Sequence, residues 1–320
     1  GMLLGLHYTP GIHTAYYSVI HLTREVYYGS MYRLYHTTLV SLVFLVLQVH
    51  TYRGVLHGSY VYVSSVLAIG VLLYLYLQVV AFIGYILPWG LMSYWGATVI
   101  TNLVYGIPSM VPWVYGGFYI HNPTLHRYCI LHSMVPIYIL VLLGIHLVYI
   151  HSLGTSSSTS IGSNSRIYFH TWVTSKDTVV LVVWLLAGSI QVYQGLILIA
   201  HPDNTLEVSI LLTPIHILPE WYFLEYYTIL KSIPSSTSGF LVMISLVVGI
   251  TEYGEPYSTS TQGKGLLGYT GRYGSIVLFT TLVVVLVWIG VQLPQGRYLS
   301  YGRVYIMSTL SYPSTSIYTP

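Results

Sequence analysis

Long stretches of this sequence contain no charged residue, and this feature limits the fold more than any other. There is no charge between Arg33 and Arg53, and the next charge-free stretch runs from Gly54 to His126. Crossing a bilayer takes about 20 apolar residues, because its core is roughly 30 Å thick and a helix rises 1.5 Å per residue. Charged residues make up only 6% of the chain, against about 25% in soluble domains. The sequence therefore predicts an all-α, polytopic bundle surrounded by membrane lipid.

The charge-free stretches predict six clear spans. They lie at Leu34–Tyr52, Tyr60–Ile86, Tyr128–His151, Thr178–Ala200, Gly239–Ile250 with its flanks, and Ser275–Leu293. Gly1–Leu6 is expected to be the stump of an earlier helix. A last helix over Tyr298–Tyr318 is doubtful because the segment is polar and contains Arg303 and Pro313. Proline and glycine punctuate residues 88–117, which predicts short surface helices there.

The cysteine count limits the possible metal chemistry. Cys129 is the only cysteine, which excludes a disulfide framework, a thiolate-held cluster and covalent haem attachment. Any metal must therefore be held by histidine, of which there are 14, and ionisable residues inside a membrane are functional candidates by default. The basic residues are spread singly and form no patch, so no nucleic-acid partner is expected.

Four of these histidines form two pairs with the same spacing. His36 and His50 lie in the first predicted span, His132 and His146 in the third, and both intervals are 14 residues. Fourteen residues of helix return to within about 40° of the starting direction and rise about 21 Å. Each helix thus has two imidazoles on one face, one near each membrane surface. Two such helices facing each other could ligate two haem irons axially.

Coincidence is the first alternative to this interpretation. About half a pair at any one offset is expected by chance, and a third pair, His7 and His21, is interrupted by Pro10 and Gly11 and is treated as noise. A single histidine inside a membrane more often hydrogen bonds to a neighbouring helix. Two matched pairs in two separate spans favour the ligand interpretation.

The topology predicts which histidines meet. One span separates the two histidine helices, so they run parallel, and His36 should face His132 while His50 faces His146. If Leu91–Ile107 also crosses the membrane, the partners exchange.

Glycines and arginines accompany the histidines. Gly70 and Gly84, again 14 residues apart, would let a macrocycle lie close to their helix, although glycine is common in membrane helices. Arg33, Arg53 and Arg127 lie near span ends, where guanidinium groups could hold haem propionates or simply extend to the membrane surface.

Five runs of sequence stand out: Y-R-L-Y-H (32–36), G-Y-I-L-P-W-G (84–90), M-S-Y-W-G-A-T-V-I-T-N-L (92–103), G-I-H-L-V-Y-I-H (144–151) and P-E-W-Y-F-L (219–224). They resemble the cytochrome b family, the haem- and quinone-binding subunit of respiratory ubiquinol–cytochrome c oxidoreductase. The resemblance extends from Gly1 to about Gln292. The spacing of the second histidine pair and the presence of P-E-W-Y on the same chain indicate a respiratory rather than a photosynthetic member.

The resemblance implies a role for each matching residue. His36 and His132 would ligate an outer, low-potential haem, and His50 and His146 an inner, high-potential haem. Glu220 would accept a proton at the quinol-oxidation site. The other residues of that site would be Tyr85, Gly96, Pro219, Tyr222 and Tyr227, and the quinone-reduction site would include His151, Lys176 and Asp177. It also implies that the short helices after Trp89 lie on the outer surface.

The chemistry of Glu220 is consistent with this role. Quinol oxidation releases two protons, and a carboxyl group in a partly desolvated site has a pKa suited to accepting one. The alternatives are a solvated loop acid for Glu220 and, for Asp177, an acidic residue that only complements a helix dipole.

The chain departs from the family pattern at three places. The family's first membrane helix would end near His7, so this sequence would contain only its last part. Glu225 stands where the family usually has an uncharged residue, which adds an acid next in sequence to the Glu220 motif. Beyond Leu293 the last helix is barely recognisable.

Together these features predict an electron-transfer subunit of the mitochondrial inner membrane. It would pass one quinol electron to a Rieske iron–sulfur subunit and the other through two b-type haems to a quinone, as a homodimer with a c-type cytochrome partner. Residues 1–200 would form the haem bundle and residues 201–320 the quinol-site loop and C-terminal helices. A ferric-reductase-like di-haem protein would keep the histidines without needing Glu220, and a transporter would use histidine as a proton relay.

Overall fold

The computed structural model describes residues 1–57, 59, 64–101, 109–155, 167–195, 200–252 and 265–316. Within these residues the chain is almost entirely helical, and no strand is present apart from an isolated bridge between Gly90 and Glu207. Four helices are long and apolar enough to cross a membrane: α3 (Gly29–Leu56), α4 (Ser64–Ile86), α7 (Asn122–Leu153) and α8 (Thr174–Gln194) with the turn before it. The predicted all-α membrane fold is confirmed.

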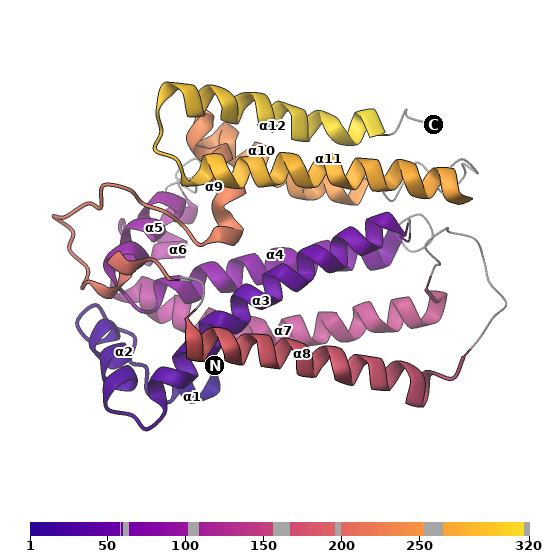
Figure 1. Ribbon diagram of the computed structural model, residues 1–320. Helices are drawn as coiled ribbons and strands as arrows, with labels where there is room; N and C mark the ends of the chain where they lie inside the picture. The colour runs from indigo at the N-terminus through magenta and orange to yellow at the C-terminus, as the bar shows by residue number, and fades with distance from the viewer. Residues whose placement is uncertain are drawn as a thin grey trace.

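The helices form two layers (Figure 1). One contains α3, α4, α7 and α8. The other contains α9 (Leu224–Ser232), α10 (Ser236–Glu252), α11 (Gly265–Val291) and α12 (Gly296–Ser316). At one end of the first layer lie the short helices α2 (Ala15–Arg24), α5 (Leu91–Thr101) and α6 (Met110–Tyr115). The predicted stump at the N-terminus is α1 (Met2–Gly5).

Local signals explain where the long helices begin and end. The start of α7 is a capping box, in which the backbone N–H of His121 donates to Thr124 Oγ1 at 3.2 Å, and Pro123 occupies the first turn, where its missing N–H costs nothing. The α8 helix ends at Gly195, whose φ of +59° suits glycine and whose N–H donates to the Gln191 carbonyl.

Apolar side chains are distributed as expected for a protein in lipid. Within the most apolar stretch of α7 no residue is buried inside the chain, and large side chains such as Leu140 (66% exposed) and Val148 (69%) point away from the protein. The packed core lies instead where the short helices meet α4 and α7, and a smaller core joins Ile229, Leu286 and Ile306 of α9, α11 and α12. The long helices are thus solvated by lipid and the two cores hold their arrangement.

The structure also decides two open questions about the spans. Within the described residues helix α5 covers Leu91–Thr101, 11 residues or about 16 Å of rise, and residues 102–107 of the questioned segment lie outside the described residues. The start of α5 is held to the loop at Leu206 by a backbone hydrogen bond of 2.9 Å. It is therefore a short helix packed under a loop, and the parallel arrangement of α3 and α7 stands. The doubted last helix does form as α12, because Arg303 Nε donates to the Ser232 carbonyl at 2.8 Å instead of facing lipid.

Some predicted bounds were wrong or fall outside the described residues. The fourth span ends at Gln194 rather than Ala200, and the sixth begins at Gly265 rather than Ser275. The fifth predicted span, Gly239–Ile250, lies within α10, whose side chains are described only for Ser236–Val247. The beginning of the predicted second span (60–63) and most of the loop between α7 and α8 (156–166) lie outside the described residues.

Candidate functional site

Two histidine pairs face each other across the bundle. The ring centroids of His36 and His132 are 6.2 Å apart, and those of His50 and His146 are 6.4 Å apart. Each pair joins α3 to α7, and this is the pairing that the spacing and the topology predict. No group of three or more possible metal ligands occurs elsewhere in the described residues, so these pairs are the strongest candidate metal sites there.

The separation within each pair fits an iron between the rings. Two metal–nitrogen bonds of about 2 Å and two ring radii of about 1.1 Å would place the centroids about 6.2 Å apart. The rings are not coplanar, with interplanar angles of 86° and 65°, and axial ligation does not require coplanar rings. The donor set, two neutral imidazoles per site, is the one that b-type haem accepts.

Second contacts orient two of the rings. His132 Nδ1 lies 3.0 Å from the Val80 carbonyl oxygen, an arrangement that leaves Nε2 with the free electron pair for a metal. The His146 ring faces the Val66 backbone in the same way, 14 residues before Val80 on α4, although its Nδ1 makes no hydrogen bond of good geometry.

Gly70 and Gly84 lie directly against these rings. A Cβ at Gly84 would come within 2.4 Å of His132 Cε1, and one at Gly70 would lie 3.4 Å from His146 Cε1. The predicted close approach is therefore present, and the structure shows that it is to a histidine of each pair. A side chain at position 84 would compete directly with the His132 ring for space, whereas a Cβ at position 70 would meet the His146 ring only at an ordinary contact distance.

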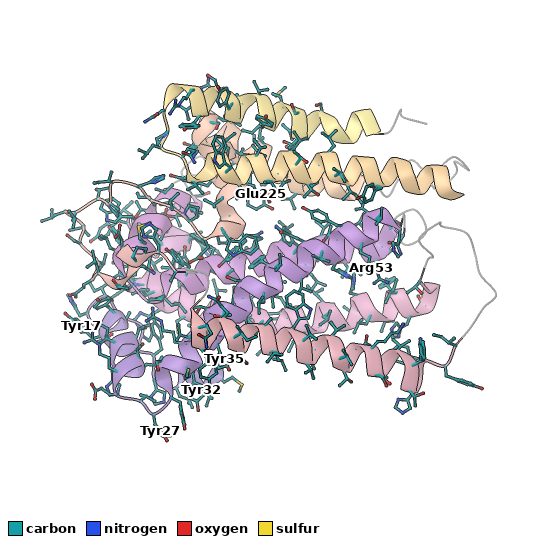
Figure 2. All side chains as sticks on the ribbon, viewed as in Figure 1. Tyr17, Tyr27, Tyr32, Tyr35, Arg53 and Glu225 are labelled. Atoms are coloured by element: carbon teal, nitrogen blue, oxygen red, sulfur yellow. The ribbon has the colours of Figure 1, made fainter. Side chains whose placement is uncertain are left out.

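The three predicted propionate arginines differ in their surroundings. Arg33 lines a cavity of about 170 Å³ together with Arg24 and Asn204. Arg53 lies near the opposite end of α3 from Tyr32 and Tyr35 (Figure 2). Arg127 donates from Nη1 to the Pro112 and Trp113 carbonyls and so caps the end of α6. That contact is a structural role that the sequence did not predict.

A second cavity, of about 220 Å³, lies beside Glu220. Its lining combines predicted and unpredicted residues: Tyr85, Ala200, His201, Pro202, Leu218, Pro219, Glu220, Trp221, Leu224 and Val291. Burial raises the pKa of Glu220 to about 7. The Tyr85 hydroxyl, at the end of α4, is buried without a partner. The cavity therefore offers a proton acceptor and an unsatisfied hydroxyl to a small, largely apolar ligand.

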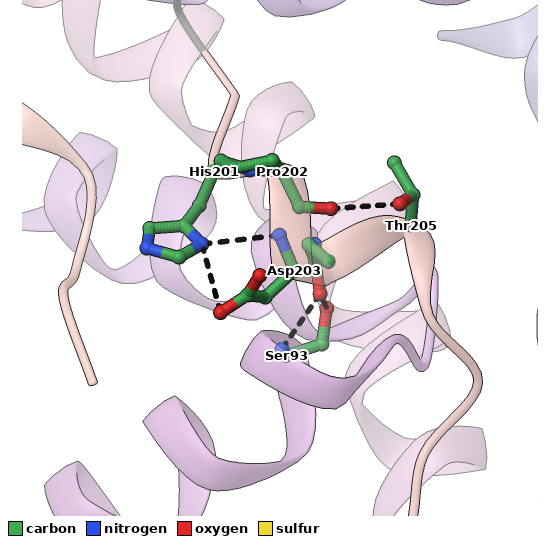
Figure 3. Close-up of polar contacts among 6 residues, drawn as sticks. Ser93, His201, Pro202, Asp203 and Thr205 are labelled. Carbon is green, nitrogen blue, oxygen red and sulfur yellow. Dashed lines mark hydrogen bonds and ion pairs between the residues drawn. The ribbon is translucent and has the colours of Figure 1, made fainter. Parts of the chain in front are cut away.

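The loop between α8 and α9 is pinned to α5 beside this cavity (Figure 3), and the same residue of α5 is bonded to α4. The Ser93 N–H donates to Asn204 Oδ1 at 2.8 Å, and Ser93 Oγ donates to the Tyr85 carbonyl at 2.7 Å. His201 Nδ1 accepts from the Asp203 N–H at 3.2 Å. A Cβ at Gly90 would lie 2.3 Å from the Asn204 carbonyl oxygen, so the loop approaches as closely as it does because position 90 is glycine. These contacts fix His201 and Pro202 in the cavity wall.

Other predicted residues of the oxidation site lie beside the cavity or apart from it. Gly96 packs near Tyr85, since a Cβ there would lie 3.9 Å from its ring. Tyr222 is buried and stacks on Phe44 with centroids 4.2 Å apart. Tyr227 does not line the cavity, and its ring lies 5.3 Å from Lys231 Nζ instead. The cavity residue His201 was missed, although the loop's concentration of polar and proline residues was a signal for it.

The predicted reduction-site residues share one end of the bundle. His151 is in the last turn of α7, and Lys176 and Asp177 are in the first turn of α8. Tyr35 donates to Ser189 Oγ at 3.0 Å, which places the end of α8 beside the start of α3 and its beginning at the His50–His146 end. Lys176 Nζ lies 5.1 Å above the Trp172 ring. No hydrogen bond or ion pair joins His151 to Lys176 or Asp177 within the part of the chain that the structure describes.

These observations define a class of protein: a membrane-spanning helical bundle with two opposed histidine pairs and an acid-lined pocket at one end. Two family models match, "Cytochrome b/b6/petB" over residues 1–154 and "Cytochrome b(C-terminal)/b6/petD" over residues 207–310. The chain belongs to the cytochrome b family.

Individual relatives agree with the family match. The chain is 37% identical to cytochrome b of Toxoplasma gondii over 99% of its own length and 86% of the relative's. It is 38% identical to cytochrome b of Plasmodium falciparum over 96% and 82% of the two chains. Among solved structures it resembles a chain of "Hyperthermophilic respiratory Complex III", with a TM-score of 0.90 and 26% identity over 98% of this chain and 85% of that one.

Proposed function

We propose that this chain is the quinol-oxidising, electron-transferring subunit of a respiratory quinol–cytochrome c oxidoreductase. The observation that carries the proposal is the presence of two histidine pairs, with ring centroids 6.2 and 6.4 Å apart, in a bundle that also has a cavity lined by Glu220. Family membership and the likeness to a respiratory complex III chain support it. The first site would hold one b-type haem between His36 and His132, and the second another between His50 and His146.

The residues of the cavity would carry the proton chemistry of quinol oxidation. Quinol gives up two electrons and two protons. The Tyr85 hydroxyl would hydrogen bond the ring oxygen, and the Glu220 carboxylate would take one proton from it. A pKa of about 7 lets Glu220 accept that proton and release it again to water near neutral pH. Leu218, Pro219 and Leu224 would exclude water around the ring.

The bundle would carry one of the two electrons onward. Haems held at the two sites would supply the one-electron steps between the cavity end and the opposite end. Arg33 and Arg53 would bind the haem propionates, and Arg127 would do so with the part of its guanidinium that α6 leaves unused. At the far end His151, Lys176 and Asp177 would donate protons to a quinone. A Rieske subunit would receive the other electron. The chain would work as a homodimer in the mitochondrial inner membrane, with a c-type cytochrome as a further partner.

Two measurements test this function. The purified protein should show the visible absorption bands of b-type haem at two haems per chain. Glu220→Gln should keep those bands and lose most quinol:cytochrome c reductase activity, by roughly 10²-fold or more. A protein without haem bands would refute the proposal. Haem bands with full activity in Glu220→Gln would refute the role of Glu220, and haem bands without quinol:cytochrome c reductase activity in the wild-type complex would favour a di-haem reductase of another kind.

A further inference from the structure

A second, partly buried acid, Glu225, does not line the cavity that contains Glu220. It is in the first turn of α9, between the buried residues Leu224 and Tyr226. Figure 2 places it where α9 and α11 approach the α3–α4 pair. The sequence suggests two neighbouring acids of one site, whereas the fold directs the two carboxyl groups to different surroundings.

The surroundings of Glu225 are phenols from three helices. Tyr226 of α9 is within hydrogen-bonding reach of its carboxyl group, and the Tyr226 hydroxyl donates to the Tyr74 hydroxyl of α4 at 3.3 Å. Tyr52 of α3 interacts electrostatically with Glu225 and hydrogen bonds to Thr280 of α11. The Ser236–Val247 part of α10 has no titratable side chain.

No cation balances Glu225 in the part of the chain that the structure describes. The groups that act on it are phenols, and burial raises its pKa to about 7. Lys231, two turns further along α9, is engaged elsewhere, since its Nζ donates to the carbonyls of Ile289, Gly290 and Gln292 at 2.6–2.9 Å. The proton affinity of a carboxyl group that has no counter-charge and is removed from water changes whenever the local charge changes.

The acid also lies beside the path between the histidine pairs. Tyr74 is four residues, about 6 Å of helix, from Gly70, which contacts His146. Tyr52 is two residues from His50 on α3. Phe44, between the two histidines of α3, packs edge-on against Tyr74 with centroids 6.3 Å apart. An electron added on this path therefore changes the electrostatic potential at the Glu225 carboxyl group, because the region between them has a low dielectric constant.

We infer that Glu225 is a proton-binding site coupled to the electron carried between the two histidine pairs, an inference that rests on the proposed function. When one electron from quinol enters the bundle, the Glu225 carboxylate binds one proton from water through the Tyr226 and Tyr74 hydroxyls, which keeps the local charge unchanged. When the electron leaves to a quinone, the carboxyl O–H bond breaks and the proton returns to water. Glu225 thus lowers the cost of holding the electron in the bundle.

The size of the coupling follows from electrostatics. A unit charge added on the order of 10 Å away raises the proton affinity of a carboxyl group about tenfold at an effective dielectric constant near 20. A tenfold change corresponds to about 59 mV for a one-electron couple. The midpoint potential of at least one haem should therefore fall by about this amount in total between pH 6 and pH 9.

The test is a spectroelectrochemical titration of the haems in the purified complex at several pH values. The wild-type potential should fall as described. Glu225→Gln should make it independent of pH over this range, and the exposed acid variant Glu25→Gln should behave as wild type. Tyr226→Phe removes the hydroxyl that lowers the Glu225 pKa and should therefore move the fall in potential to higher pH, which keeps the inference testable if Glu225→Gln does not assemble.

The outcomes separate this inference from the proposed function. Absence of b-type bands would refute the proposed function itself. Normal bands with wild-type potentials that do not change with pH, or a pH dependence that persists in Glu225→Gln, would overturn the role of Glu225 alone.

Discussion

Replacing Gly84 by alanine should specifically disturb the histidine pair nearest the cavity. A Cβ at this position would lie 2.4 Å from His132 Cε1 and 2.9 Å from Nδ1, well inside van der Waals contact. The ring must move, because the other side of the contact is the backbone of α4. Movement lengthens the 3.0 Å contact between His132 Nδ1 and the Val80 carbonyl.

The magnitude can be worked out from opposing terms. Alanine favours the helix over glycine by up to about 1 kcal/mol, whereas forcing a methyl group into a packed site costs about 1–3 kcal/mol. Loss of an orienting hydrogen bond on a metal-binding histidine costs roughly 10- to 100-fold in metal affinity. At Gly84 the unfavourable terms dominate, so haem between His36 and His132 should be lost or weakly held.

Gly70→Ala is the matched control for this prediction. There the nearest atom, His146 Cε1, is 3.4 Å from the added Cβ, which is an ordinary contact. The higher helix propensity of alanine should therefore roughly offset any packing cost. The assay is haem content per chain from the reduced-minus-oxidised spectrum. We expect about one haem in Gly84→Ala and two in Gly70→Ala. Full haem content in both variants would refute the argument that this glycine makes room for His132.

Three further predictions concern the cavity and its supports. Because the Glu220 pKa is raised to about 7 and the proton acceptor is the ionised form, quinol oxidation should speed up as pH rises through 7 and then level off, and Glu220→Gln should lose this step in the pH–rate profile. Lys231→Met removes the donor to three carbonyls at the end of α11 and should destabilise the protein by about 1–3 kcal/mol, seen as a lower midpoint of thermal unfolding, whereas Lys231→Arg should retain most of the stability. Asn204→Ala leaves the Ser93 N–H without its acceptor and should raise the apparent KM for quinol and the protease sensitivity of the loop, with haem spectra unchanged; an unaltered KM would show that this contact does not shape the cavity.

Much of the fold was predictable because the helix period is local. Charge-free stretches located α3, α4 and α7, and the 14-residue intervals placed each histidine pair on one face. The pairing of His36 with His132 followed once α5 proved to be a short helix. Helix α8 ends before the predicted Ala200 because Gly195 closes it, and α11 begins ten residues before the predicted span, in a segment where Arg272 interrupts the charge-free stretch. Hydropathy alone does not detect either boundary.

The sequence by itself determined that this chain lies in a membrane, that its helices carry histidines at two depths, and that P-E-W-Y brings an acid to a loop. Only the tertiary structure decided that His201 joins Glu220 in one cavity wall, that Arg127 caps α6, and that Glu225 faces phenols of α3 and α4. The reason is physical: spacing along one helix is set by backbone geometry, whereas contacts between different helices and loops depend on how these elements pack together.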